Sequence, residues 1–282
     1  MTTTVSPNSP LARAVSTPGQ RAGNAVGLIC VALVYAFLML PIIIIALMSL
    51  SAGEVLAFPP QGISLRWFVA VFHNEAFMRA MGISLALAAG ATVVSCIIGV
   101  AAALYVVRYA TRAREALRLL LMLPLMLPEI LTGIALLFFL YATGIGTKTV
   151  FGLVVGHVLV TLPYVFTNVA SALYNQDASI ERAARSLGAT PFRAFRCVTL
   201  PLIKPGLITG GMFAFVISFD LFNMSLLLKG IGMTTLPLQL FDYLRYDFDP
   251  AAAAVSTLSV LLTLAAVIAV DRVVGLRSLR FG

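Results

Sequence analysis

The chain has 282 residues, of which 60% are hydrophobic and 11% are charged, against roughly 25% charged residues in a soluble globular domain. With a mean hydropathy of +1.01, this composition excludes an ordinary soluble domain, which would expose large apolar patches to water, and indicates a protein that resides in lipid. The excess of 19 basic over 11 acidic residues does not indicate nucleic-acid binding, because the basic residues fall between apolar runs and form no single stripe.

Residues 1–22 are rich in Ser, Thr and Pro and are predicted to be a disordered cytoplasmic tail, followed by one transmembrane domain over residues 23–282. Six apolar runs in that domain reach the length of about 20 residues that a membrane-spanning helix needs. They cover approximately residues 25–50, 80–107, 119–141, 149–173, 206–229 and 251–271. The runs are continuous and do not alternate, so they predict helices and not barrel strands. The first run is too long for the apolar part of a cleaved signal peptide, and we interpret it as a retained span.

The basic residues indicate the direction of the spans. Fourteen lie on one side of the predicted membrane: Arg13, Arg21, Arg108, Arg112, Arg114, Arg118, Arg182, Arg185, Arg193, Arg196, Lys204, Arg272, Arg277 and Arg280. Five lie on the other side: Arg66, Arg79, Lys148, Lys229 and Arg245. Because cytoplasmic loops carry the excess of Lys and Arg, both termini are predicted to be cytoplasmic. The expected fold is an all-α membrane protein with six transmembrane helices.

The first long outer segment, residues 64–80, is predicted to be amphipathic. Its side chains expected in the membrane interface are Trp67, Phe68, Val71, Phe72 and Phe77, while Arg66, Asn74 and Glu75 would face water.

The cytoplasmic loop between spans four and five, residues 174–205, is predicted to hold a short helix–turn–helix. An apolar stripe with helical spacing is formed by Ile180, Ala183, Ala184 and Leu187. Asp177 or Ser179 can cap the first helix, and Gly188 supplies a left-handed stop. Thr190 caps a second helix with Pro191 in its first position. A stripe with two alanines is suited to dock in a groove of another protein; the alternative is a helix that lies on the inner leaflet.

Six residues of this loop fall on a fixed spacing: Ala183, Ala184, Gly188, Val198, Leu200 and Pro201. The spacing resembles the cytoplasmic signature of the inner-membrane permeases of ABC importers, which reads Glu-Ala-Ala, three residues, Gly, nine residues, an aliphatic residue, one residue and Leu-Pro. Arg182 stands where the signature has Glu, and Glu181 precedes it, which turns the carboxylate by about 100° around the helix. The resemblance covers roughly residues 25–282, and the runs PEILTGIALL and SFDLFNMSLLLKG are most similar to the spermidine/putrescine branch.

The resemblance implies a role for the loop and a set of partners. The helix pair would be the coupling helix that sits in a cleft of the ATP-binding subunit, with contacts from Glu181, Arg182, Ala183, Ala184, Leu187 and Gly188. A dimer of that subunit would bind ATP and Mg, whereas this chain has no G-x-x-x-x-G-K-[ST] loop and no expected cofactor of its own. A second, different permease chain would complete the path, a periplasmic binding protein would deliver the solute, and the location would be the bacterial inner membrane.

Two acidic residues within the predicted spans are candidates for the solute path, since ionisable groups in a membrane are costly and usually face a cavity or a partner. Asp220 lies in span five, and Glu129 lies in span three directly after Pro128, with Pro124 one turn earlier. The two prolines free backbone carbonyls and are predicted to kink this helix. Ser218, Asn223 and Ser225 are polar neighbours of Asp220, each also suited to a hydrogen bond between helices. A single acid at this point favours a monocationic or zwitterionic solute, and the solute class stays open among polyamines, opines and amino-acid derivatives.

Several other residues are assigned to packing. His157 in span four is interpreted as a neutral, packed histidine and not as a proton relay. Close helix packing is predicted for Gly82, Gly90, Gly99, Gly210 and Gly211. The three cysteines, Cys30, Cys96 and Cys197, have neither metal-site nor disulfide spacing, and no metal site is expected.

The predicted function is a permease subunit of an ATP-driven importer for a small amino-bearing organic solute. The alternative is a stand-alone secondary transporter driven by an ion gradient, which would favour inverted repeats and more ionisable groups within the spans. A membrane-embedded enzyme or assembly factor is not favoured, because the sequence has no nucleophile–base pair, HExxH motif or clustered metal ligands.

Overall fold

The computed structural model describes residues 18–146 and 148–274. Its α-helices are α1 (Pro18–Ser49), α2 (Arg66–His73), α3 (Glu75–Leu104), α4 (Arg114–Met126), α5 (Glu129–Thr143), α6 (Val150–Tyr174), α7 (Ala178–Ser186), α8 (Pro191–Ala194), α9 (Leu200–Phe219), α10 (Phe222–Leu228), α11 (Leu236–Tyr243) and α12 (Ala251–Val274). Two π-helical turns, η1 (Tyr105–Tyr109) and η2 (Phe195–Thr199), continue α3 and precede α9. Within the described ranges the only β-type pairing is one isolated bridge, between Ser51 and Ile63. The expectation of an all-α fold is confirmed.

Five of the predicted spans correspond to single long, apolar helical stretches, and the third corresponds to a bent pair. The predicted span 119–141 is divided into α4 and α5, which meet at an angle of 107°. Pro128 explains the break, because a proline forces the preceding residue out of the helical region, and Leu127 is indeed extended, with ψ of 147°. The prediction of one continuous third span was therefore wrong, although the kink was expected at these prolines.

The fifth predicted span, residues 206–229, has different bounds in the structure. The continuous helical stretch runs from Pro191 to Phe219, through α8, η2 and α9, and it ends at Asp220. Residues 222–228 form the separate helix α10. The hydropathy of the sequence continues across this break because Leu221 and Phe222 are apolar, so the sequence pattern could not reveal it.

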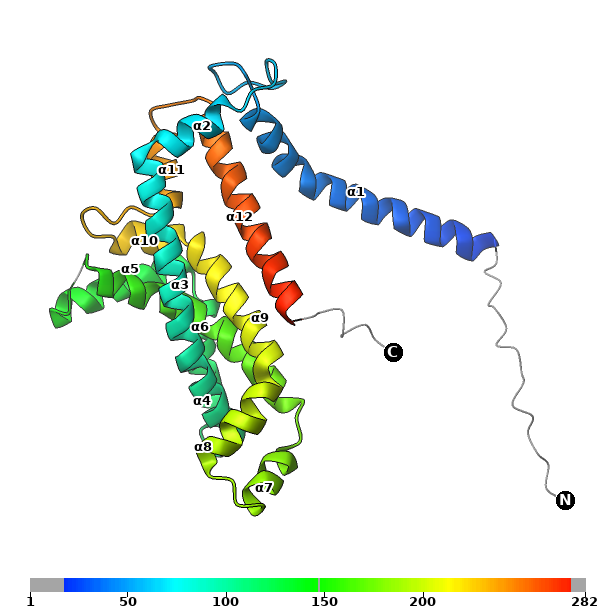
Figure 1. The fold of residues 1–282 in the computed structure, drawn as a ribbon, viewed down its shortest axis with the longest axis vertical. Coiled ribbons are helices and arrows are strands. Elements are labelled where there is room, and N and C mark those ends of the chain that lie inside the picture. Colours follow the sequence, from blue (N-terminus) through cyan, green and yellow to red (C-terminus); the bar gives the residue numbers. More distant parts are fainter. Residues whose placement is uncertain (1–17, 147, 275–282) are drawn as a thin grey trace.

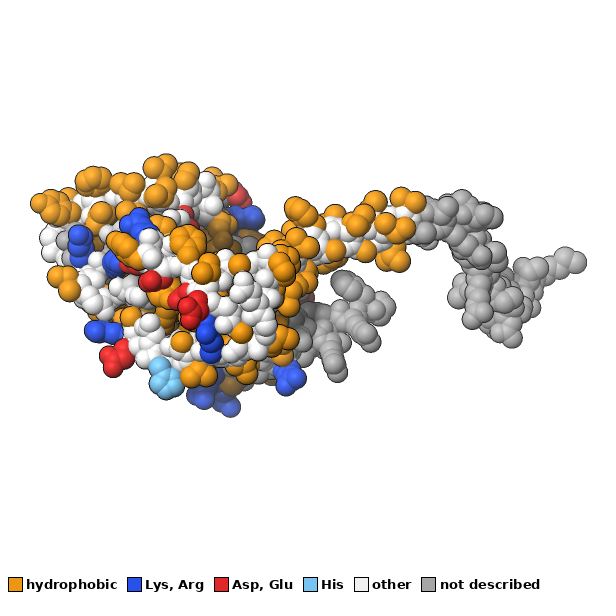
Figure 2. Space-filling model, turned by 90° about the horizontal axis from the view of Figure 1, so that it is seen from above, with side chains coloured by type: hydrophobic (Ala, Val, Ile, Leu, Met, Phe, Trp, Pro, Cys, Tyr) orange, Lys and Arg blue, Asp and Glu red, His pale blue; other side chains and the backbone are white. Residues whose placement is uncertain are grey.

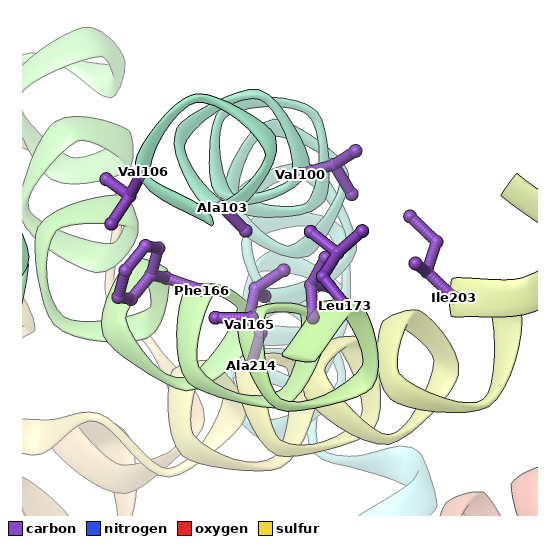
Figure 3. Packing of buried hydrophobic residues seen from close by; sticks show 10 residues of the cluster. Val100, Ala103, Val106, Val165, Phe166, Leu173, Ile203 and Ala214 are labelled. Carbon is purple, nitrogen blue, oxygen red and sulfur yellow. The ribbon is translucent and has the colours of Figure 1, made fainter. Parts of the chain in front are cut away.

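The core lies where α3, α6 and α9 pack together. Figure 3 shows side chains of α6, among them Val165, Phe166 and Leu173, between α3–η1 on one side and α9 on the other. A Cβ atom on Gly206 would lie 2.6 Å from the Asn168 carbonyl oxygen, and one on Gly210 would lie 2.9 Å from the Val165 Cα. These two glycines therefore let the backbones of α6 and α9 meet.

The predicted packing glycines divide into two groups. Gly99 faces Val165 and Gly211 faces Cys96, and a Cβ added to either glycine would be in tight contact with that neighbour. The predicted close packing is confirmed for these two glycines. Gly82 and Gly90, however, have nothing within 4 Å of an added Cβ. For these two the prediction was wrong within this chain, because the sequence does not show which face of α3 meets α6 and α9.

Helix α1 stands apart from the bundle. It extends away from the other helices (Figure 1), and hydrophobic side chains cover it (Figure 2). Only the last residue of its apolar stretch Val26–Ser49, Ser49, is buried, and its neighbour in the bundle is α12. Such a surface is stable in lipid or against another apolar helix. Most of the predicted tail, residues 1–22, lies outside the described residues, and α1 begins at Pro18.

The outer segment 64–80 contains helix α2 and the first turns of α3, with Asn74 between them as the N-cap of α3. Trp67 and Arg66 both donate hydrogen bonds to the Gly53 carbonyl oxygen. Phe77 is only 2% exposed. The prediction that Phe77 lies in the membrane interface was therefore wrong, because the segment turns into α3 at Asn74 and directs this ring into the core. The same prediction was wrong for Val71, which is 4% exposed and belongs to the same hydrophobic cluster.

We predict that Gly206→Ala destabilises the protein, because the new methyl group would lie against the Asn168 carbonyl oxygen and the Ala172 methyl group. Overpacking of this kind costs about 1–3 kcal/mol. Gly90→Ala is the matched control, since nothing lies within 4 Å of its new methyl group. Thermal unfolding of both variants in detergent checks the prediction. Equal midpoints for the two variants would contradict close contact between α6 and α9.

Candidate functional site

The helix–turn–helix predicted between spans four and five is present as α7 and α8. Asp177 caps α7, with its carboxylate 2.8 Å from the Ser179 backbone nitrogen. Hydrogen bonding to Ser179, through its side chain and its backbone, lowers the pKa of Asp177, and the positive charges of Arg182 and Arg108 act in the same direction. Gly188 has φ of +90°, and Thr190 caps α8 by accepting from the Arg193 N–H. The predicted cap and stop residues are confirmed.

One face of α7 is turned toward the chain's own bundle. Glu181 is half-buried, and its carboxylate accepts a hydrogen bond of 3.1 Å from the Thr199 hydroxyl in η2. Ala184, one turn later, is also half-buried. This face connects the loop helix directly to the inner end of the α9 stretch.

The opposite face of α7 is open. Arg182 and Ala183 are exposed, Leu187 is 89% exposed, and Ile180 is 47% exposed. The predicted stripe is therefore split, because Ala184 contributes to the inner face and the other three positions face outward. We call Ile180, Arg182, Ala183, Arg185, Leu187 and Phe192 the docking face; Phe192, on α8, is 70% exposed.

The docking face is strongly basic. Within the described residues the only ion pair is Lys229–Asp242, on the outer side of the predicted membrane. No carboxylate among the described residues therefore lies within salt-bridge distance of Arg182 or Arg185. The two acids of the loop, Asp177 and Glu181, already accept hydrogen bonds from their own chain.

The length of the helices places α7 away from the hydrocarbon. The 29 residues from Pro191 to Phe219 would extend about 43 Å, whereas the hydrocarbon core of a bilayer is about 30 Å thick. Lys204 lies 13 residues after Pro191, so the basic inner part of this stretch accounts for the excess length. Figure 1 places α7 at the extreme end of the bundle, opposite α2 and α11.

The candidate path residue Asp220 lies at the other end of α9, where that helix stops. Its side chain is exposed and lines a cavity of about 440 Å³ between the α9–α10 break, α11 and α12. The rings of Phe222 and Phe241 also line this cavity and meet edge to face, with centroids 5.1 Å apart. Glu129 is not among the lining residues, so the structure does not bring the two candidate acids together in this cavity.

His157 bridges the two sides of the α9–α10 break. Its Nδ1 lies 2.8 Å from the Ser218 hydroxyl at the end of α9, and its Nε2 lies 3.1 Å from the Ser225 hydroxyl in α10. All three side chains are buried. The interpretation of His157 as a packed histidine agrees with this geometry. Ser218, predicted on the path, points instead to His157.

The two remaining candidates, Glu129 and Asn223, are half-buried. Glu129 begins α5 directly after the bend, and its Oε1 atom is buried without a hydrogen-bond partner among the described residues. Asn223 lies in α10.

Metal binding finds no support in the described part of the chain, where no group of three or more His, Cys, Asp or Glu residues could hold an ion.

Sequence reasoning missed three residues of these sites: Thr199, Phe222 and Phe241. Thr199 follows Glu181 by 18 positions, and only the return of the chain through α8 brings them together. The two phenylalanines come from different helices, so no local spacing links them.

Comparison with known proteins gives consistent matches. Residues 95–278 match the family described as binding-protein-dependent transport system inner membrane component. The chain is 33% identical over 230 residues to the putrescine transport system permease protein PotI of Escherichia coli (strain K12), covering 79% of this chain and 82% of that protein. It is 30% identical over 235 residues to the spermidine/putrescine transport system permease protein PotC of Haemophilus influenzae, covering 83% and 91%. Among solved structures, a bacterial ABC transporter involved in the import of the acidic polysaccharide alginate has a similar fold, with a TM-score of 0.69 at 19% identity, covering 92% of this chain and 97% of that one.

We predict that His157→Leu destabilises the region around Asp220, because Ser218 and Ser225 would lose their buried partner. Leaving buried polar groups unsatisfied costs about 1–3 kcal/mol. His73→Leu is the control, since His73 is exposed and contacts only the Val69 carbonyl oxygen of its own helix. Thermal unfolding and solute uptake should both fall in the first variant and stay near wild type in the second. Wild-type stability of His157→Leu would contradict a structural role for the bridge.

Proposed function

The chain belongs to the family of binding-protein-dependent transport system inner membrane components and is a permease subunit of an ABC importer, and from its geometry we propose that α7 and α8 dock it to the ATP-binding subunit. The observation that carries this proposal is the docking face. It combines exposed apolar side chains with arginines that have no ion-pair partner among the described residues, as expected of a surface that another protein covers. Both termini are then cytoplasmic, on the same side as the docking face.

The proposed assembly contains four kinds of component. Two copies of an ATP-binding subunit bind ATP and Mg and provide all hydrolysis, so this chain has no cofactor and no catalytic activity of its own. A second, different permease chain provides the other half of the path. A periplasmic binding protein delivers the solute at the outer loops, near α2 and α11. The complex lies in the bacterial inner membrane.

The proposed solute is a small amino-bearing organic compound of the polyamine, opine or amino-acid-derivative class. The relatives PotI and PotC support this class, since they are permease proteins of a putrescine and a spermidine/putrescine transport system. Asp220 is the principal path residue, with Asn223 and Glu129 as further polar groups along the way. Ser218 contributes indirectly, since its hydroxyl is within hydrogen-bond distance of His157.

The proposed mechanism is alternating access driven from the docking face. When ATP closes the partner dimer, α7 moves with it. The hydrogen bond between Glu181 and Thr199 passes this movement to η2 and the α9 stretch, which runs as one helical unit to Asp220. The path then opens outward at the end where Asp220 lies. A secondary transporter driven by an ion gradient would need no exposed docking face and is not supported by the family of this chain.

A pull-down of the tagged chain from native membranes in mild detergent tests the assembly, with the copurifying proteins identified by mass spectrometry. The proposal expects an ATP-binding subunit and a second permease chain. A solitary chain, with uptake that survives ATP depletion and stops with an uncoupler, would contradict it.

We predict that Gly188→Val reduces uptake and the coupling of ATP hydrolysis to it, because Gly188 has φ of +90°, which a β-branched residue rarely adopts. A strain of about 1–3 kcal/mol at this turn would shift the docking equilibrium roughly 5- to 150-fold. Gly144→Val is the matched control, since Gly144 also has positive φ but ends α5, away from the docking face. Uptake and membrane insertion are measured for both variants. If both variants lower uptake equally, the effect of Gly188→Val comes from general backbone strain. The proposed role of this turn in docking would then be contradicted.

We also predict that Thr199→Val uncouples hydrolysis from transport, because valine keeps the volume of threonine but cannot donate to Glu181. Loss of a hydrogen bond to a carboxylate costs about 1.5–3 kcal/mol, equivalent to roughly a tenfold or greater change. Solute moved per ATP hydrolysed is the quantity to measure in proteoliposomes. Glu181→Gln keeps an acceptor for Thr199 and should have a smaller effect. Equal effects of Thr199→Val and the exposed control Thr190→Val would contradict a connecting role, because Thr190 caps α8 without contacting Glu181.

A further inference from the structure

The cavity beside Asp220 has the composition of a binding site for one organic cation. It measures about 440 Å³ and lies where α9 ends, with α11 and α12 as its other walls. Its described lining contains one acid, Asp220, the aromatic residues Phe219, Phe222 and Phe241, and the hydroxyl residues Ser256 and Ser259 on α12. The Asp220 carboxylate forms no hydrogen bond or ion pair with another described residue.

Three features of the cavity favour positive charge. The carboxylate of Asp220 provides a full negative charge. The C-terminal end of α9, whose cap is Asp220, adds the partial negative charge of a helix terminus. The faces of aromatic rings attract cations, and ammonium groups are recognised by such rings when a site is shielded from water. The paired rings of Phe222 and Phe241 make one wall of this cavity.

The charges around the cavity provide for one ammonium group and not for two. Leu221, the residue after Asp220, is apolar and 4% exposed. Asp242 on α11 is not among the lining residues, and its carboxylate lies 3.8 Å from the Lys229 amine. The Arg245 guanidinium lies 4.6 Å from the centroid of the Phe241 ring, so a positive charge already lies against this wall. A second ammonium group would be repelled there, whereas an acidic group would be attracted.

We propose that the cavity is a subsite for a single ammonium group, and that it selects solutes with one positive charge, zwitterions included, over diamines of the same length. This inference rests on the proposed function, since it assumes that the solute passes Asp220. The carboxylate holds the ammonium group, Ser256 and Ser259 provide acceptors for its remaining hydrogens, and the aromatic wall covers the carbon chain. A diamine can bind through either of its two equivalent ammonium groups. Its affinity therefore exceeds that of a monoamine only by this statistical factor.

The experiment uses the purified complex of this chain with its copurifying subunits, in lipid nanodiscs and without the periplasmic binding protein. Three four-carbon probes are titrated by saturation-transfer NMR: n-butylammonium, 4-aminobutanoate and 1,4-diammoniobutane. The proposal expects the diamine to bind no more than about twofold more tightly than n-butylammonium, and 4-aminobutanoate to bind at least as tightly. Binding of the diamine tenfold or more tightly than n-butylammonium would overturn the proposal, because it would require a second acid.

Variants separate the cavity from other binding surfaces. Asp220→Asn should weaken all three probes at least tenfold, and Phe241→Leu, which keeps an apolar wall without a ring, should weaken them severalfold. Asp242→Asn is the matched control, since Asp242 lies on the same helix as Phe241 but does not line the cavity, and it should leave n-butylammonium binding within twofold. Unchanged binding in both Asp220→Asn and Phe241→Leu would overturn the subsite. Copurification of the ATP-binding subunit is scored in the same preparations, so failure of the subsite remains distinct from failure of the importer assignment.

Discussion

The contact between the backbones of α6 and α9 is the constraint on which the rest of the molecule depends. At Gly206 and Gly210 a single added carbon would lie within 3 Å of α6, so these helices cannot separate or slide without losing a wide apolar contact. Lipid offers no hydrophobic force that joins helices, and close packing of this kind replaces it. Since α9 continues from η2 and α8, the contact holds one helical unit that reaches from Pro191 on the inner side to Phe219 toward the outer side.

Each end of this unit carries a polar connection to a neighbouring helix. At the inner end the Thr199 hydroxyl binds Glu181, which fixes α7 to the bundle while its basic, apolar outer face stays open. At the outer end His157 joins Ser218 to Ser225 across the break and thereby positions the turn that contains Asp220. Under the proposed function, movement of α7 would reach Asp220 through one continuous element, which would convert closure of a separate ATPase into a change of access. Under the proposed function, the basic docking face would favour an acidic groove in the ATP-binding subunit.

Much of this arrangement can be predicted from the sequence. The features that cannot be predicted from it share a common cause. Hydropathy identifies the spans, and Asp177, Gly188 and Thr190 identify the caps and the turn of the docking pair, because these signals are local in the chain. The end of α9 at Asp220 was missed because the apolar run continues through Leu221 and Phe222. The 107° bend before α5 was foreseen only as a kink, since proline marks the place of a break and not its angle. The partners of Glu181 and His157, the ring pair beside Asp220 and the open surroundings of Gly82 and Gly90 depend on tertiary contacts, which no spacing in one sequence reveals.

The most direct test of the central claim is photocrosslinking from position 187 in native membranes. Leu187 is 89% exposed at the centre of the docking face, and a photoreactive amino acid there contacts whatever covers that face in the cell. Position 261 on α12, where Leu261 is 54% exposed within a predicted span, serves as the reference for a side chain in lipid. The account predicts that position 187 crosslinks to an ATP-binding subunit and position 261 does not. Crosslinks to lipid alone from both positions would contradict it, because the helix pair would then lie on the inner leaflet.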